Sequence, residues 1–301
     1  MSEPGVVMLS VQADAGFVET EEVRELTKRA LSYVAAGFPV HLCGPAGSGK
    51  TTLALRLAEQ IGRPVVLIYG DEETRSCDLV GGASGFHRQR VVDNFIHSVL
   101  KTEESVSQQW VDQRLLVACR EGLTLVYDEF TRSRPETNNV LLSILEERVL
   151  PLPAMRLDGG YLQVHPNFVA VFTSNPEDYV GVHPTQDALR DRLVSIYLDP
   201  FDWDTEVAIT QSRSGLPREE AETVVRTVRA FRKLELPGTQ RSLRDCIKIA
   251  RILRQQGASA GPEEPMFVQT CKDVLVSQVP FNKAAPAWDK LQSLLAQEAR
   301  S

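Results

Sequence analysis

The sequence predicts an α/β protein, in which a parallel sheet has helices on both faces and is followed by a smaller all-helical domain. Two observations carry this prediction. In the first part of the chain, short continuous apolar runs alternate with helical patterns, and such runs are typical of strands buried in a parallel sheet. After Pro200 the apolar runs stop and only helical patterns remain. The predicted strands are residues 39–43, 65–69, 123–127, 168–172 and 194–198.

Helical periodicity predicts further elements between these strands. One helix is expected from Glu21 to about Ala36, with Thr20 as its N-cap, and others over 52–61 and 138–148. A loop is expected over 255–265, inside the helical region. The predicted domains are a flexible N-terminal tail over 1–16, an αβα domain over 17–203 and a helical lid domain over 204–301.

The composition excludes several classes of protein. The chain has 301 residues, of which 43% are hydrophobic and 24% charged, as in ordinary globular proteins. Its net charge of −7 gives no electrostatic footprint for nucleic acid, so DNA or RNA is not the partner we expect, although this charge is compatible with local basic patches. The five cysteines include no C-x-x-C pair and indicate free thiols in a reducing compartment. No apolar run is long enough to span a bilayer, and the first residues lack the basic flank of a signal peptide. We therefore expect a cytoplasmic protein.

A phosphate-binding loop is the strongest motif in the chain. Residues 44–51 read GPAGSGKT and match the pattern G-x-x-x-x-G-K-[ST], with a predicted strand before them and a predicted helix after them. In such a loop, backbone N–H groups and a helix N-terminus face the phosphates. We expect Lys50 to contact the β- and γ-phosphates of ATP and Thr51 to ligate Mg²⁺. The predicted nucleotide-binding residues are Gly44, Pro45, Ala46, Gly47, Ser48, Gly49, Lys50, Thr51 and Thr52.

A pair of carboxylates ends the strand predicted over 123–127, as in a Walker B motif. Phosphoryl transfer needs one carboxylate to hold Mg²⁺ and a second to orient and polarise water. Asp128 fits the first role and Glu129 the second. An Asp-Glu pair after a strand also occurs as ordinary helix capping. The phosphate loop upstream favours the catalytic interpretation.

Asn175 follows the strand predicted over 168–172, within Ser174-Asn175-Pro176. Its amide is suited to hydrogen-bond the γ-phosphate or the attacking water, which is the role called sensor 1. The alternative is a turn, because the Asn-Pro dipeptide favours turns in any context.

Three arginines are candidates for contacts with the phosphates. Arg192, or as second choice Arg190, is placed to act as a finger that stabilises transition-state charge in a neighbouring subunit's site. The alternative is a surface salt bridge to Asp187 or Asp191. Arg244 opens a predicted helix and is a candidate sensor 2, although a solvated helical arginine explains it nearly as well.

From about Phe17 to about Leu253 the chain resembles the MoxR branch of the AAA+ ATPases, on the motifs GPAGSGKT, LVYDEF, FTSNP, ALRDRL and RSLRD in that order. Within that branch, the strings FVET, DLVGG, VDNFIHSVLKTEE and YDEFTRSRP are similar to the members that act in gas vesicle formation. The resemblance implies a homo-oligomeric ring, a hexamer in this family, with gas vesicle shell and accessory proteins as partners. Leu193 stands where many relatives have Phe, so the choice between Arg190 and Arg192 stays open.

The resemblance also predicts two inserted segments. Residues 81–90 are Gly-rich, then aromatic and basic, and are expected either to line a central pore or to form a mobile surface loop. Residues 151–165, with Asp158-Gly159-Gly160 as a turn signal, are expected to form a hairpin. Arg132 and Arg134 are candidates to contact an adjacent subunit, or are solvated loop arginines.

The predicted function is Mg²⁺-dependent ATP hydrolysis that remodels shell or accessory proteins during gas vesicle formation, in the cytoplasm and in association with vesicles. Two alternatives stay open. In one, ATP locks a conformation that docks on the vesicle shell and turnover is incidental. In the other, the chain activates a metabolic enzyme, as other MoxR ATPases do.

Overall fold

The computed structural model describes residues 16–93, 101–152, 160–176, 181–234, 236 and 242–298, with the backbone alone described within 83–109. The chain forms two compact units. The first unit contains residues 33–41 and 58–195, and the second contains 42–57, most of helix α1 (Glu21–Ala35) and the chain from 196 onward. The expected flexible tail lies outside the described residues apart from Gly16.

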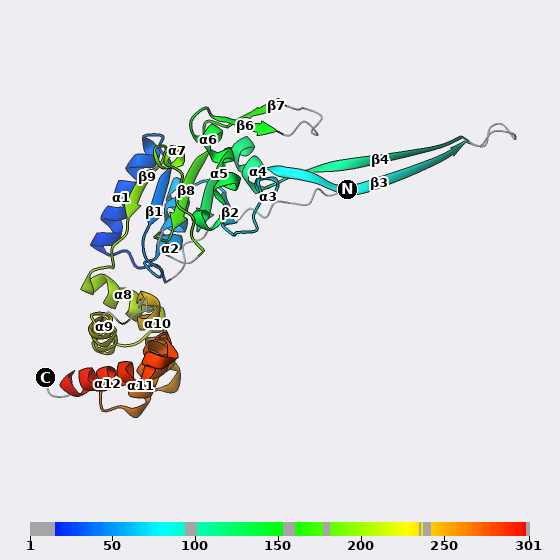
Figure 1. Ribbon diagram of the computed structural model, residues 1–301. Helices are drawn as coiled ribbons and strands as arrows, with labels where there is room; N and C mark the ends of the chain where they lie inside the picture. Colours follow the sequence, from blue (N-terminus) through cyan, green and yellow to red (C-terminus); the bar gives the residue numbers. More distant parts are fainter. Residues whose placement is uncertain are drawn as a thin grey trace. The chain divides into compact units, whose positions relative to one another are not determined.

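The predicted fold class is confirmed. Five strands form a parallel sheet in the order β2-β5-β8-β1-β9 (Figure 1). Register pairs Ile68 with Tyr127, and Tyr127 with Phe172. The Val194 and Leu198 N–H groups donate to the Pro39 and Cys43 carbonyls, so β9 advances in the same direction as β1. The strands are β1 (Val40–Cys43), β2 (Val65–Tyr69), β5 (Thr124–Asp128), β8 (Val169–Ser174) and β9 (Val194–Tyr197), each close to its predicted range.

The apolar runs form strands because both faces of the sheet are covered. Every residue of β5 is buried, and helix α4 (Arg114–Glu121) packs against β2 and β5. An aromatic group of Tyr127, Phe130 and Phe172 lies at the centre of the first unit's core, where each ring is almost completely buried. Burial of such side chains contributes on the order of 2 kcal/mol each. This packing fixes the strand ends that carry the candidate site.

The prediction of a single helix over 138–148 is wrong in its bounds. The chain forms two short helices there, α5 (Pro135–Asn138) and α6 (Val140–Leu145). Arg148 has a φ of +59°, which an α-helix does not accommodate, and strand β6 (Val149–Leu152) begins at the next residue. Strand β6 pairs antiparallel with β7 (Gly160–Gln163), so the predicted hairpin is confirmed, although residues 153–159 of its turn are outside the described part.

A second hairpin is the largest element that the sequence analysis missed. Strand β3 (Gly81–Asp93) pairs antiparallel with β4 (Lys101–Asp112) in a long ribbon that starts beside helix α3 (Ser76–Val80) (Figure 1). Residues 81–90, which are expected either to line a central pore or to form a mobile surface loop, lie within strand β3. Glycine-rich and charged sequences have low strand propensity, and pairing overrides that propensity here. The role of this segment at a pore stays a prediction.

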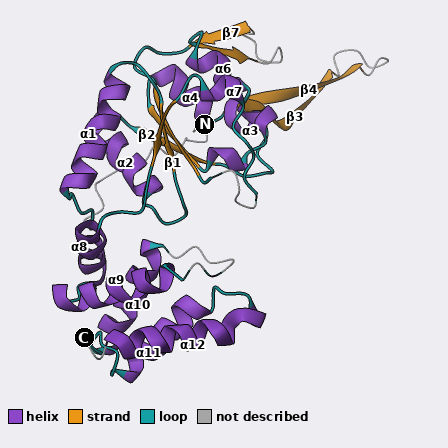
Figure 2. Ribbon diagram, turned by 60° about the vertical axis from the view of Figure 1, so that its left-hand side comes forward, coloured by secondary structure: helices purple, strands orange, loops and turns teal. Residues whose placement is uncertain are grey.

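The second unit confirms the change of pattern after Pro200. Among the described residues from 203 onward, Figure 2 shows helices and loops alone. A core around Val207, Val224, Phe231 and Ile249 holds these helices together. They are α8 (Trp203–Ser214), α9 (Arg218–Arg232), α10 (Leu243–Gln256), α11 (Pro265–Cys271), a π-helix (Lys272–Val276) and α12 (Phe281–Glu298).

Two further features are the polarity of the helices and the state of the cysteines. In the described part of the chain, every helix is too short or too polar to cross a membrane. All five cysteines are free: Cys43, Cys77, Cys119, Cys246 and Cys271. The domain boundaries predicted at 16/17 and 203/204 stay a prediction.

Candidate functional site

The phosphate loop joins β1 to helix α2 (Lys50–Ile61), and its glycines are required by the backbone. Gly47 and Gly49 have φ values of +81° and +80°, in the left-handed region that favours glycine. Gly44 lies so close to the end of β9 that a Cβ there would be 2.7 Å from the Leu198 carbonyl oxygen. The sequence therefore folds locally into a tight turn whose N–H groups precede a helix N-terminus.

Lys50 and Ser48 give this loop its polar side chains. Lys50 is 7% exposed, and its Nζ donates to the carbonyls of Gly44 and Pro45, each at 2.8 Å. The ammonium is thereby held over the loop. Ser48 Oγ is buried and has no hydrogen-bond partner among the described residues. An ammonium, a buried hydroxyl donor and a helix N-terminus are the donor set that phosphate oxygens accept from.

The N-terminus of helix α10 packs on the same loop, within the second unit. A Cβ on Gly47 would lie 2.3 Å from Ser242 Cβ and 3.6 Å from Arg244 Cγ. Ser242 caps the helix, since its Oγ accepts a hydrogen bond from the Arg244 N–H at 3.2 Å. The Ser242 N–H in turn donates to the Asp245 carboxylate, which completes a capping box. Arg244 is exposed, and in the described structure its guanidinium has no hydrogen-bond or ion-pair partner. The structure brings Arg244 beside the loop, and its contact with phosphates stays a prediction.

In the first unit, Thr173 holds the two Walker B residues. Asp128 is 6% exposed at the end of β5. The Thr173 hydroxyl donates to the Asp128 carboxylate and accepts from the Glu129 N–H at 2.9 Å. Glu129 has a φ of +52°, which is uncommon outside glycine. Thr173 thus fixes both the buried carboxylate and the turn that places Glu129. The sequence analysis missed Thr173; its signal was the hydroxyl two residues before Asn175.

The Glu129 carboxylate is more exposed than Asp128 and forms an ion pair with Arg132 at 3.0 Å. Arg132 therefore contacts Glu129 of its own chain. Arg134 lies 3.7 Å from Glu72 and is largely exposed. Both arginines belong to the segment directly after the Walker B strand, and their contact with an adjacent subunit stays a prediction.

Asn175 lies directly beyond β8, next to the strand end that carries Asp128. Because β5 and β8 are parallel and Tyr127 is opposite Phe172, the C-terminal ends of these two strands lie at the same side of the sheet. Asn175 is half-buried, and the described residues offer its side chain no hydrogen bond. The structure thus brings Asp128, Glu129 and Asn175 to neighbouring strand ends.

The two finger candidates differ in their surroundings. They follow helix α7 (Asp187–Arg190), before β9. Arg190 is 49% exposed and lies 3.7 Å from Asp187. Arg192 is 26% exposed and is paired with Glu146, and it also donates to the Ala188 carbonyl. Arg190 thus pairs with Asp187, one of the two partners that the salt-bridge alternative names, whereas Arg192 pairs with Glu146. The finger role of either arginine stays a prediction.

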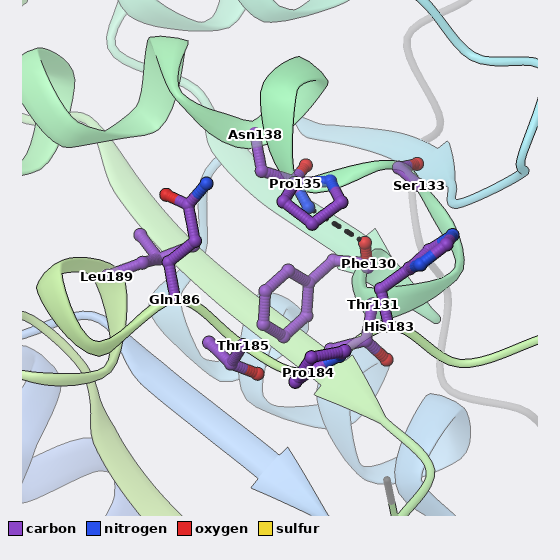
Figure 3. Close-up of a pocket in the computed structure, with 10 residues that line it drawn as sticks. All are labelled: Phe130, Thr131, Ser133, Pro135, Asn138, His183, Pro184, Thr185, Gln186 and Leu189. Atoms are coloured by element: carbon purple, nitrogen blue, oxygen red, sulfur yellow. Dashed lines mark hydrogen bonds between the residues drawn. The ribbon is translucent and has the colours of Figure 1, made fainter.

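A small pocket lies between the segment after Glu129 and the segment that leads into α7 (Figure 3). Asn138 is buried in its wall, and its Nδ2 donates to the Phe130 carbonyl at 3.1 Å. This bond fixes the backbone one residue beyond Glu129. The lining residues are Phe130, Thr131, Ser133, Pro135, Asn138, His183, Pro184, Thr185, Gln186 and Leu189.

His41 is a second polar residue that the sequence analysis missed. It lies within β1 and is 6% exposed. Its Nε2 is 2.8 Å from Ser174 Oγ, and its Nδ1 is 2.9 Å from Ser195 Oγ. Burial, and secondarily the positive charge of Arg190, lower the pKa of His41 to about 4. The imidazole is therefore neutral at neutral pH. Its signal in the sequence was one polar residue inside an apolar run.

Comparisons with known proteins identify the family. Residues 39–193 match the AAA domain of the dynein-related subfamily. The gas vesicle ATPase GvpN of Ancylobacter aquaticus is 50% identical over 93% of this chain and 78% of its own length. GvpN1 of Halobacterium salinarum is 41% identical over 89% of this chain and 76% of its own. Protein NorQ of Paracoccus denitrificans is more distant, at 28% over 67% of each chain.

A solved structure supports the fold. The RuvB Holliday junction branch migration motor of Thermotoga maritima superposes with a TM-score of 0.51 over 85% of this chain and 70% of that one, at 17% identity. At that identity the likeness concerns the fold alone. The resemblance predicted from the motifs is confirmed by the identity to curated relatives. The chain is a nucleotide-binding AAA+ ATPase and belongs to the family of the gas vesicle ATPases GvpN.

Proposed function

We propose that this chain hydrolyses ATP with Mg²⁺ and uses the reaction to remodel gas vesicle shell or accessory proteins. The observation that carries the hydrolytic step is the pair of hydrogen bonds made by Thr173. They fix the Asp128 carboxylate and the Glu129 backbone N–H. The two neighbouring carboxylates lie in different environments, with Asp128 buried and Glu129 partly exposed. A buried, oriented carboxylate suits a metal ligand, and an exposed one suits the base that orients water.

The remaining roles are assigned by chemistry. Mg²⁺ prefers oxygen ligands, and the Thr51 hydroxyl and the Asp128 carboxylate would hold it, so that it neutralises charge on the phosphates. Lys50 would bind the β- and γ-phosphates, and Arg244 would contact them as sensor 2. Asn175 would hold the attacking water, from which Glu129 takes a proton. These assignments are supported by the donor types at each position and stay proposals.

A ring, a hexamer by family, is proposed because an arginine finger acts on the site of a neighbouring subunit. Arg192 is our first candidate and Arg190 the second. A finger must exchange its own partner for phosphate, and Arg192 would have to leave Glu146 to do so. This pairing is also the observation that favours the second candidate function. In that function, ATP locks a conformation that docks on the vesicle shell, and turnover is incidental.

The partner assignment comes from the family. Relatives named gas vesicle ATPases cover most of this chain at 40–50% identity. We propose that this chain acts in the cytoplasm on gas vesicle shell or accessory proteins. The lower identity to NorQ disfavours an activator of a metabolic enzyme.

The test is ATP hydrolysis per chain as a function of protein concentration, for wild type, Arg192→Ala and Arg190→Ala. The matched control is Arg24→Ala, since Arg24 is an exposed arginine with an i,i+3 carboxylate partner, as Arg190 is. We expect the wild-type specific rate to rise with concentration and the finger variant to lose at least about 10³-fold. A flat rate that is indifferent to both arginines would contradict the shared site.

The two candidate functions separate in a gas vesicle formation assay with Glu129→Gln in place of wild type. Hydrolysis-driven remodelling predicts that vesicle yield falls together with ATP turnover. A normal yield with a variant that binds ATP without hydrolysing it would favour the docking function. Lys50→Ala is the control, because either function requires bound nucleotide and so predicts loss of vesicles.

A further inference from the structure

We infer that His41 is a positioning residue for ATP hydrolysis: its imidazole fixes the strand ends that carry Asn175, Glu129 and the finger arginines relative to one another. The inference rests on the proposed hydrolytic function. It concerns only residues of the first unit.

The first contacts of His41 are to the two strands on either side of β1. The Nε2 atom is 2.8 Å from Ser174 Oγ, and Ser174 directly precedes Asn175 on β8. The Nδ1 atom is 2.9 Å from Ser195 Oγ on β9, three residues beyond Arg192. Both ring nitrogens are therefore engaged. Through them the His41 side chain connects β8, which ends directly before Asn175, to β9, which follows the finger candidates.

A third contact reaches the Walker B turn. The His41 ring meets the Phe130 ring edge-on, with centroids 5.2 Å apart and an interplanar angle of 88°. Phe130 follows Glu129 directly and is 1% exposed. Its backbone carbonyl is held by Asn138 (Figure 3). Its ring packs on Phe172, with the two ring centroids 5.3 Å apart. Phe130 has little freedom to move, so displacement of the imidazole would be transmitted to the turn that carries Glu129.

The chemistry of this position suits a neutral imidazole. It offers one N–H donor and one acceptor on opposite sides of a rigid ring, and each serine hydroxyl can supply the complementary group. Ser174 is 2% exposed, so an apolar replacement for His41 would leave its buried hydroxyl without this partner. The ring is kept neutral by burial, since the pKa of His41 is lowered to about 4. An amide side chain can replace only one of the two contacts.

The experiment compares ATP affinity and turnover of wild type and His41→Leu. We expect kcat to fall about 10- to 100-fold, since misplacement of reacting groups by about 1 Å can cost about 100-fold. ATP affinity should change by less than about twofold, since Lys50 and the phosphate loop are unaltered. Arg192→Ala should cost less in the His41→Leu background than in wild type, because the finger strand is already misplaced.

Two amide variants test the direction of each contact. Gln places its amide near the Nε2 position and keeps the Ser174 contact, whereas Asn places it near Nδ1 and keeps the Ser195 contact. We expect His41→Gln to restore more of kcat than His41→Asn, because Ser174 adjoins Asn175. Val66→Ala is the control for general destabilisation, since Val66 is buried in β2 at the other edge of the sheet. It should lower the thermal midpoint without the selective loss of kcat.

A folded His41→Leu with wild-type turnover would overturn the inference, as would a kcat loss that Val66→Ala reproduces at equal stability. If His41→Leu does not fold, Ser174→Ala and Ser195→Ala replace it, and wild-type kcat in both would overturn the inference equally. Failure of the proposed function gives a different result. In that case wild type itself shows no ATP turnover at any concentration.

Discussion

The phosphate loop and the Walker B turn are built in opposite ways. In the loop, the absence of side chains sets the geometry: Gly44 and Gly47 allow approaches that a single Cβ would block. In the Walker B turn, added side chains set it. Thr173 from the next strand fixes Asp128 and the backbone of Glu129, and Asn138 fixes the carbonyl of Phe130.

This difference has a consequence for how each region tolerates change. A loop whose geometry depends on its backbone is sensitive to one added methyl group. The residues that give the loop this geometry are consecutive in the sequence. A turn held by side chains from distant segments is sensitive to the loss of one hydroxyl or amide. Three substitution experiments test this contrast.

The largest effect is expected from separating binding from turnover with Lys50→Ala and Glu129→Gln. Lys50→Ala should abolish tight ATP binding, because the loop loses its one buried ammonium. Glu129→Gln should bind ATP normally and lose about 10²- to 10⁴-fold in kcat, the usual contribution of a general base. Nucleotide titration and steady-state hydrolysis measure the two quantities, with the exposed-lysine variant Lys28→Ala as control. Robust turnover by Glu129→Gln would remove Glu129 as the base, and unchanged binding by Lys50→Ala would remove the loop assignment.

An intermediate effect is expected from Gly47→Ala. The added Cβ would lie 2.3 Å from Ser242 Cβ, so the start of helix α10 or the loop must shift. We expect ATP affinity to fall about tenfold or more, which corresponds to a loss of about 1.4 kcal/mol or more of binding free energy. Gly62→Ala is a matched control, because Gly62 also has a positive φ, +73°, but has open space around it. Equal effects of the two variants on affinity would show that backbone strain alone, rather than the contact with Ser242, matters at Gly47.

The smallest effect is expected from Thr173→Val, which keeps the shape of the side chain and removes the hydroxyl. Asp128 then loses a charge-assisted hydrogen bond, typically about 1.5–3 kcal/mol, and the Glu129 N–H loses its acceptor. Part of this loss should appear as a kcat about tenfold lower, with ATP affinity little changed. Thr173→Ser retains the hydroxyl and should keep most of the activity. Turnover by Thr173→Val equal to that of wild type would show that the Walker B turn holds its geometry without Thr173.

Sequence reasoning predicted the five sheet strands, the helical region and the phosphate loop, because each is encoded in consecutive residues. Continuous apolar runs such as Val65–Tyr69 identify buried strands, and Gly44 to Thr51 is a contiguous pattern. It missed the β3–β4 hairpin, whose strands have low strand propensity and are stabilised by pairing with each other. It also made the helix after Walker B too long, since nothing local showed that Arg148 adopts a left-handed conformation.

By itself, the sequence predicted which residues would carry the chemistry: Lys50 in the phosphate loop, Asp128 and Glu129 at the end of β5, and Asn175 directly after β8. The tertiary structure decided what holds them. Thr173 reaches Asp128 across two strands that are more than forty residues apart in the chain. His41 joins Ser174 to Ser195 across a far longer separation. Such partners are set by strand order and register, which arise from packing of the whole sheet, so no local pattern encodes them.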